Sequence, residues 1–210
     1  MPKIKMHKSQ PHIDMTPMVD LFFLLLTFFM LTTSFRAKEA ALIDTPNSVS
    51  EKQAPEMNVM TLFIDKDGKV FFNLDNGVDT TRQYRKKVLL KMADKFGAKF
   101  TAEELKRFSL LTSFGMPFKD IKKWIMAEGS QKDQYQTGVP IDSTNNELAW
   151  WIFYTRETDK EIVTQIKGDA KADYKAVKTV LDILQEKNVN KFNLTTNLEG
   201  VEVKIDEYKK

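Results

Sequence analysis

Cysteine is absent from the 210-residue chain, and histidine occurs only at His7 and His12. The lack of cysteine excludes disulfide frameworks, thiolate metal sites, thiol nucleophiles and a lipid-modified N-terminal cysteine. Because no histidine follows residue 12, the rest of the chain lacks the usual general base and the commonest metal ligand. Serine–histidine–aspartate triads and histidine-based zinc motifs are therefore excluded.

Glycine is scarce as well, and the eight glycines form neither GxGxxG nor GxxxxGK, so no phosphate-binding loop is expected. The composition argues against an enzyme, and we expect no cofactor and no metal site. The 32 Lys and Arg residues are spread along the chain against 29 Asp and Glu. Without a basic stripe, nucleic acid is not an expected partner. Hydrophobic residues make up 42% of the chain, which is enough for a packed core.

One apolar run departs from this average composition. Residues 18–35 read MVDLFFLLLTFFMLTTSF, with Asp20 as the only charged residue. At about 1.5 Å per residue, roughly 18 helical residues span about 27 Å, close to the hydrocarbon thickness of a bilayer. We predict a single transmembrane helix over residues 18–36, preceded by a tail over residues 1–17.

The flanking charges predict the orientation of this helix. Lys3, Lys5 and Lys8 precede it, whereas Arg36 and Lys38 follow with an acid close behind. This bias favours a cytoplasmic N-terminus and places the hydrophilic remainder across the membrane. A cleaved signal peptide is the alternative, and it would make the protein a secreted binding protein. The long preceding tail, which contains Asp14, and the lack of a small-x-small cleavage site argue against it.

Asp20 has two interpretations within this run. Removal from water favours the neutral form of a carboxyl group, so an acid inside a membrane is a candidate proton carrier. The alternative is an interfacial residue that caps the start of the helix. Thr16, Thr27 and Ser34 share the helix face of Asp20, and a polar stripe on a single span requires partners. Alternatively, the hydroxyls donate to carbonyls of their own helix.

The pattern Ile13-x-x-Thr16-Pro17-x-x-Asp20, followed directly by a Leu- and Phe-rich span, resembles the signature of the ExbD/TolR family. Members of that family are single-span subunits of proton-driven inner-membrane motors. Ile13 and Pro17 belong to the motif that precedes the acid, and Asp14 stands where asparagine is common. The resemblance implies that Asp20 is the essential proton-binding carboxylate and that the proton is the coupling ion.

The same resemblance implies partners. Two copies of the helix would lie inside a five-fold ring of a multi-span ExbB/TolQ-type protein, with membrane lipid around the assembly. A TonB-type protein would receive the motion and energise outer-membrane transport. A TolR-like role in envelope maintenance is the alternative within the family. A rival of another class is a passive membrane-anchored adaptor or wall-binding domain, in which Asp20 is only a helix cap.

The resemblance continues beyond the membrane. Residues 42–48 (LIDTPNS) are similar to the family's short extended segment outside the membrane, with Ile43 and Pro46 at its characteristic positions and Thr45 in place of the usual leucine. Residues 62–70 and 166–196 are similar to strands and a helix of the family's soluble domain. Asn188 stands where that domain often has a helix-ending glycine. Residues of about 76–160 have no counterpart and are predicted to be a helical insertion.

The hydrophilic part is predicted to be an α+β domain, a small sheet backed by helices, over residues 58–210 after a periplasmic linker over residues 37–57. A hairpin is expected around the turn at Asp67 and Gly68. Capping boxes predict helix starts at Thr101 and Thr144. The other expected helices cover residues 81–96, 118–127 and 172–187, and the other expected strands cover 162–167, 191–196 and 201–205. The aromatic residues at 150, 151, 153 and 154 suggest either a glycan platform or core packing.

Overall fold

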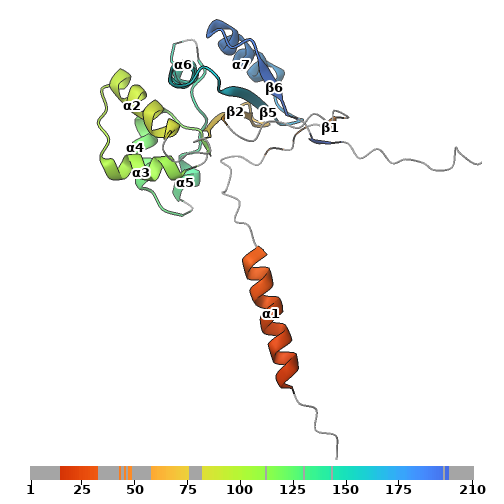
Figure 1. Cartoon of the computed structure of the whole chain (residues 1–210). Helices are drawn as coiled ribbons and strands as arrows, with labels where there is room; N and C mark the ends of the chain where they lie inside the picture. The colour runs from red at the N-terminus through yellow and green to blue at the C-terminus, as the bar shows by residue number, and fades with distance from the viewer. Residues whose placement is uncertain are drawn as a thin grey trace, which may run out of the picture. The chain divides into compact units, whose positions relative to one another are not determined.

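The computed structural model forms two compact units, Met1–Ala37 and Lys38–Lys210 (Figure 1). Each unit is considered by itself. The structure describes residues 15–32, 43, 45, 47–48, 58–75, 82–111, 113–129, 131–142, 144–195 and 197–198. The edge strand predicted over residues 201–205 lies outside these residues.

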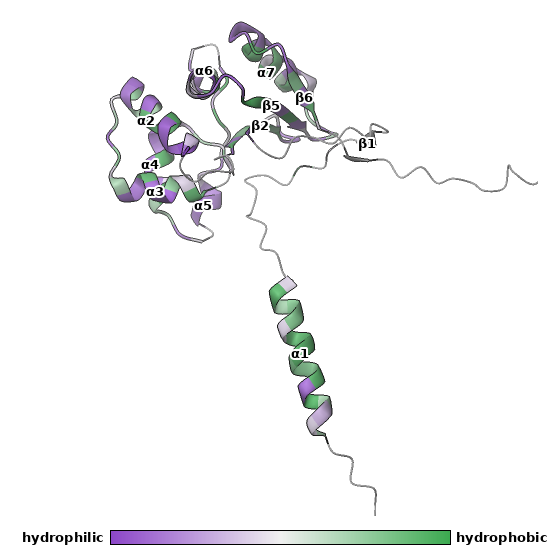
Figure 2. Cartoon of the chain, viewed as in Figure 1, coloured by the Kyte–Doolittle hydropathy of each residue, from purple (hydrophilic) through white to green (hydrophobic). Residues whose placement is uncertain are grey.

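The first unit contains one helix, α1, which covers Thr16–Thr32. None of its residues is buried, and its large apolar side chains are all at least 44% exposed. Figure 2 shows hydrophobic residues along most of this helix. Within the described part of the chain, no helix combines the length and the apolar character needed to cross a membrane. Residues 33–36 of the span predicted from the sequence lie outside that part.

The second unit is built on a five-stranded open sheet with the order β4-β3-β2-β5-β6. The central strand β2 pairs antiparallel with β3 and parallel with β5. A separate parallel pair joins β1 to β7. The strands are β1 Asn47–Ser48, β2 Val59–Ile64, β3 Val70–Leu74, β4 Ser113–Phe114, β5 Val163–Gly168, β6 Phe192–Leu194 and β7 Asn197–Leu198.

Six helices complete the described part of this unit: α2 Tyr84–Phe96, α3 Ala102–Leu110, α4 Phe118–Met126, α5 Gln131–Gln134, α6 Glu147–Thr158 and α7 Tyr174–Glu186. The α+β fold with a small open sheet backed by helices is therefore confirmed. The short helix α5 and the two-residue strand β4 are additions that the sequence did not predict.

Two predicted chain reversals are confirmed in detail. Gly68 takes a positive φ of 73° in the turn between β2 and β3, where the Asp65 N–H donates to the Lys69 carbonyl at 3.0 Å. Asn188, with φ of 58°, ends α7 in the left-handed conformation that the sequence predicts for a helix terminator. The Val189 N–H then donates back to the Leu184 carbonyl at 2.8 Å.

The predicted insertion shares one core with the sheet. Trp151 of α6 is 1% exposed, and its ring centre lies 4.8–6.4 Å from those of four phenylalanines. These four come from β3, α3, β4 and α4, namely Phe72, Phe108, Phe114 and Phe118. Residues 76–160 therefore supply helices to the common core and add β4 to one edge of the sheet.

The capping box predicted from Thr144 to Glu147 is wrong. Asn146 is the N-cap of α6, and its side-chain oxygen accepts from the Ala149 N–H at 3.0 Å. The Glu147 carboxylate is buried and accepts from the Phe118 N–H at 2.6 Å. Pro117, at the N-cap position of α4, makes no side-chain hydrogen bond. The Glu147 carboxylate, 29 residues later in the chain, instead accepts from a free backbone N–H at the start of that helix.

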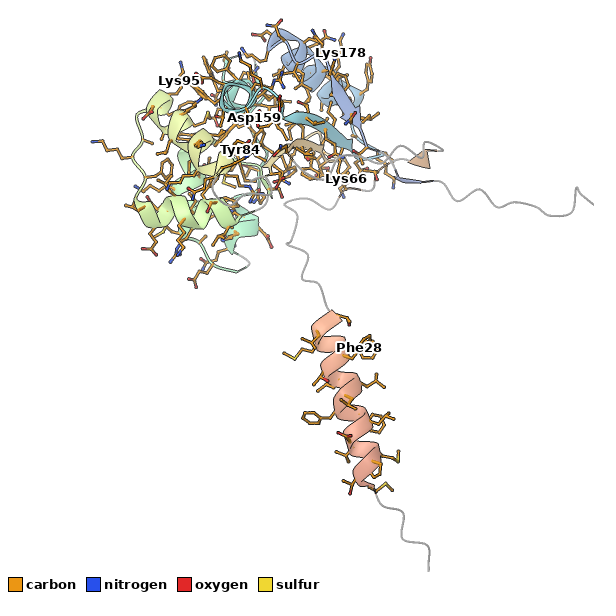
Figure 3. The ribbon with its side chains drawn as sticks, viewed as in Figure 1. Phe28, Lys66, Tyr84, Lys95, Asp159 and Lys178 are labelled. Carbon is orange, nitrogen blue, oxygen red and sulfur yellow. The ribbon has the colours of Figure 1, made fainter. Side chains whose placement is uncertain are left out.

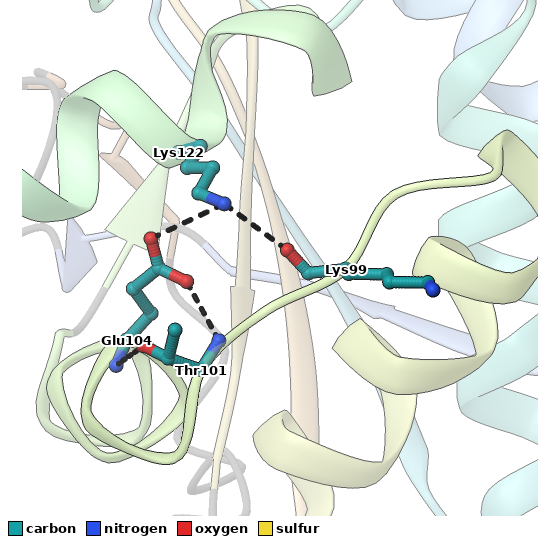
Figure 4. Close-up of polar contacts among 4 residues, drawn as sticks. All are labelled: Lys99, Thr101, Glu104 and Lys122. Atoms are coloured by element: carbon teal, nitrogen blue, oxygen red, sulfur yellow. Dashed lines mark hydrogen bonds and ion pairs between the residues drawn. The ribbon is translucent and has the colours of Figure 1, made fainter.

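The capping box predicted at Thr101 is confirmed (Figure 4). The Thr101 N–H donates to the Glu104 carboxylate at 2.7 Å, and the Thr101 hydroxyl accepts from the Glu104 N–H at 3.3 Å. The ammonium of Lys122 in α4 lies 3.6 Å from the same carboxylate and donates to the Lys99 carbonyl at 3.1 Å. Glu104 thus joins the start of α3 to α4.

Because of this arrangement, we expect the free energy of unfolding to fall at acid pH. The hydrogen bond from the Thr101 N–H, together with the charge of Lys122, holds the pKa of Glu104 below its usual value. A lowered folded-state pKa gives stability above the unfolded pKa of about 4.3, and this stability is lost as the pH falls through the folded value.

We expect Glu104→Gln to lower the free energy of unfolding by about 1 kcal/mol at neutral pH, with the difference shrinking toward acid pH. Urea unfolding at a series of pH values measures both effects. Glu103→Gln, at an exposed neighbouring position, is the control and is expected to change stability by less than about 0.5 kcal/mol. A Glu104→Gln difference that stays constant with pH would contradict the assignment.

Candidate functional site

The candidate site lies on α1, where Asp20 is the only charged residue. The helix begins at Thr16, so Asp20 is its fifth residue and lies one turn inside it. An N-cap side chain precedes the helix and accepts from the second or third helical N–H. Asp20 therefore does not occupy the N-cap position of α1. Within the described residues, its carboxylate has no hydrogen-bond or ion-pair partner.

The helical geometry places Thr16, Asp20 and Thr27 on one face, within about 40° of rotation about the axis. The Thr27 hydroxyl donates to the Leu24 carbonyl at 2.9 Å, so its hydrogen bond is made inside the helix. The alternative of bonding back to the same helix is thus confirmed for Thr27. Asp20 is the member of the stripe that calls for an outside partner.

Of the three other candidate residues of the motif and the polar stripe, the structure describes only one. Pro17 is the second residue of α1. Backbone N–H groups in the first turn have no acceptor within the helix, so the missing N–H of proline costs no hydrogen bond there. Ile13 and Ser34 lie outside the described residues. Figure 3 shows the side chains of α1, Phe28 among them, projecting outward around the helix.

The segment expected just outside the membrane lies in the second unit. Ile43 and Thr45 are half-buried and irregular, and Pro46 is outside the described residues. The next two residues form β1, which pairs in parallel with β7, with Asn47 opposite Asn197. Through this strand pairing, the segment lies beside the residues that follow β6.

The aromatic residues of α6 separate into core and surface. Trp151 belongs to the core, whereas Trp150 is half-buried beneath the Lys95 ammonium, 4.1 Å from its ring centre. Phe153 is 44% exposed and Tyr154 is half-buried. A single platform of all four aromatic residues is not formed, because Trp151 points into the core.

A polar cluster that sequence reasoning missed connects α2 to the end of α6. The Tyr84 hydroxyl donates to the Asp159 carboxylate at 2.6 Å and accepts from Arg82 at 2.9 Å (Figure 3). Hydrogen bonds from Tyr84 and from the Glu161 N–H lower the pKa of Asp159, and the bond to Asp159 raises the pKa of Tyr84. The partners are 75 residues apart, so no local pattern could reveal them. Their role is to hold two helices together.

Comparisons with known proteins agree with the motif on α1. Residues 6–101 match the family described as biopolymer transport protein ExbD/TolR. The Tol-Pal system protein TolR of Pseudomonas aeruginosa is 32% identical over 81 residues, which are 37% of this chain and 55% of that protein. The chain thus spans about half the length of this relative, and no solved structure matches it. The family match includes the motif that holds Asp20 and continues through α2, so residues 6–101 of this chain are similar to the ExbD/TolR family.

Proposed function

We propose that this chain is the single-span subunit of a proton-driven inner-membrane motor and that Asp20 carries the proton. The proposed span covers residues 18–36, with the N-terminus in the cytoplasm and the second unit in the periplasm. The observation that carries the proposal is one carboxylate placed inside an exposed apolar helix, without a partner among the described residues. The match of residues 6–101 to the ExbD/TolR family supports it.

The energy released when a proton crosses the membrane is similar to the cost of placing a charged side chain in a membrane helix. One proton moving down 100 mV releases about 2.3 kcal/mol. A charged side chain near the middle of a membrane helix costs about 2.5–3.5 kcal/mol on insertion scales, and less toward the interface. Protonation therefore switches Asp20 between an ionised state that faces a polar partner and a neutral state that faces apolar surroundings, at little net cost. Alternation between these states would turn or rock the helix.

The proposed partners follow from the surface of α1. Its exposed phenylalanines and leucines suit lipid or apolar helices, whereas the Asp20 carboxylate requires a polar partner. We infer a multi-span ExbB/TolQ-type protein around the helix and a second copy of this chain beside it. We propose no enzymatic activity and no cofactor other than the transported proton.

Two outputs fit such a motor. The similarity to the Tol-Pal system protein TolR favours envelope maintenance through a Tol-type system. Coupling to a TonB-type protein and outer-membrane import is the other output that the family resemblance implies. The identity of the protein that binds the second unit would distinguish them.

Co-purification in mild detergent tests the proposal. We expect the full chain, tagged at its C-terminus, to elute in a stable assembly with a multi-span membrane protein. The matched control replaces residues 18–36 by an unrelated single-span helix, which removes the Asp20 face but keeps the anchor. That variant is expected to elute without the partner. A wild-type chain that elutes without any multi-span protein, or a control that retains it, would refute the motor assignment.

A further inference from the structure

The basic residues of this chain are not spread evenly through the fold. Residues 82–135, which include α2, α3 and α4, contain 13 Lys and Arg against six Asp and Glu. The rest of the chain contains 19 Lys and Arg against 23 Asp and Glu. The small overall charge of +3 therefore combines a strongly basic helical region with an acidic remainder, and such asymmetry is typical of proteins that meet an anionic surface.

Helix α4 turns its lysines away from the core. Its buried side chains are Phe118, Ile121, Trp124 and Ile125. The opposite face follows the spacing i, i+3, i+4 and i+7, and all four of its residues are exposed: Lys119, Lys122, Lys123 and Met126. The outward face of α4 thus combines three ammonium groups with one exposed apolar side chain.

The end of α2 and the loop after it extend this face. Phe96 is 41% exposed, and its ring stacks on that of Phe118 at 4.7 Å. The carbonyl of Lys99 accepts from the Lys122 ammonium, which places the loop beside α4 (Figure 4). We name the resulting surface the basic face, and it consists of Phe96, Lys99, Lys119, Lys122, Lys123 and Met126.

Carboxylates neutralise only part of the basic face. Glu104 lies 3.6 Å from the Lys122 ammonium, and Asp120 lies 3.8 Å from that of Lys123. Among the described residues, neither Lys99 nor Lys119 has an ion-pair partner. The face therefore keeps an excess of positive charge next to exposed apolar side chains, which is the composition of surfaces that bind membrane interfaces.

We propose that the basic face binds the anionic lipid headgroups of the membrane in which the chain is anchored. The proximity of that membrane rests on the proposed function, in which the chain continues from the span directly into the second unit. This covalent link keeps the unit at high effective concentration near the bilayer. Each lysine close to an anionic membrane raises binding about fivefold, and the side chains of Phe96 and Met126 enter the interface.

Vesicle binding of residues 38–210 tests this assignment without the helix α1. This piece holds the complete described core, to which α1 contributes no residue, so it is expected to fold alone. Vesicles of phosphatidylcholine alone are compared with vesicles that also contain phosphatidylglycerol, by co-sedimentation. We expect binding to the anionic vesicles only, and loss of that binding at high salt.

A triple variant locates the binding on the surface. Lys99→Gln, Lys119→Gln and Lys123→Gln together are expected to weaken binding at least about tenfold. The matched control changes three exposed lysines elsewhere, Lys171→Gln, Lys175→Gln and Lys178→Gln, and alters the net charge equally. Its binding is expected to stay at the wild-type level, with both variants melting at the wild-type temperature.

Several results would overturn the proposal. Equal loss in both triple variants would show that only net charge matters, and equal binding to neutral vesicles would exclude headgroup recognition. Binding to polyglutamate without binding to vesicles would assign the face to an acidic protein instead. Because this assay omits α1 and the co-purification assay does not depend on these lysines, either proposal can fail while the other stands.

Discussion

Replacing Asp20 by asparagine is expected to abolish proton-driven output while leaving the assembly with the multi-span partner intact. Asparagine keeps the size and polarity of the side chain, but it has no proton to release and cannot become charged. A switch between ionised and neutral states is therefore lost, although the helix can still pack in the same place. The output is measured as outer-membrane integrity, or as import for a TonB-type system, in cells whose only copy carries the variant.

The chain offers a matched control on the same helix face. The Thr27 hydroxyl already donates to the Leu24 carbonyl, so Thr27→Val removes one intrahelical bond and no titrating group. We expect its output to stay close to that of the wild type. If Asp20→Asn left the output undiminished, the motor reading would be lost and a passive anchor would remain, since an anchor has no need of an ionisable group.

Trp151→Ala is expected to give the largest loss of stability, about 3–5 kcal/mol in the free energy of unfolding. The side chain is 1% exposed, and its ring lies among phenylalanines from two strands and two helices. Its removal would leave a cavity at the point where the sheet and the predicted insertion share a core. Chemical denaturation of residues 38–210, followed by near-UV circular dichroism, measures the loss.

The neighbouring tryptophan is the control for this substitution. Trp150 is half-buried and touches Phe153, Tyr154 and the Lys95 ammonium at the surface of α6. Trp150→Ala is expected to cost about 1 kcal/mol. Equal losses at the two positions would contradict the view that the insertion and the sheet are joined through Trp151.

Elements with a local signal were predicted from the sequence, because their cause is local. The Asp-Gly turn fixes the hairpin of β2 and β3, and the capping box at Thr101 and Glu104 fixes the start of α3. The helical periodicity also placed Asp20 on the face of Thr16 and Thr27. That Asp20 lies inside the helix, and not at its cap, required the observed start of α1 at Thr16.

The misses all depend on residues that are distant in the chain. Thr144 and Asn146 are both acceptable helix caps, and Asn146 takes the role once the Glu147 carboxylate is drawn to the start of α4. Strand β4 has two residues, too few for an alternating pattern, and exists because β3 pairs with it.

The pairing of β2 sets an order of folding events. One edge of β2 pairs with β3, which follows directly, whereas Thr61 on the other edge faces Gln165, 104 residues later. The sheet cannot close until almost the whole chain has left the ribosome or the translocation channel. A sheet that pairs such distant residues folds slowly. Meanwhile the unpaired edge of β2 can pair with strands of other chains. Until β5 is available, β2 keeps one edge unpaired and depends on β3 alone for its strand hydrogen bonds.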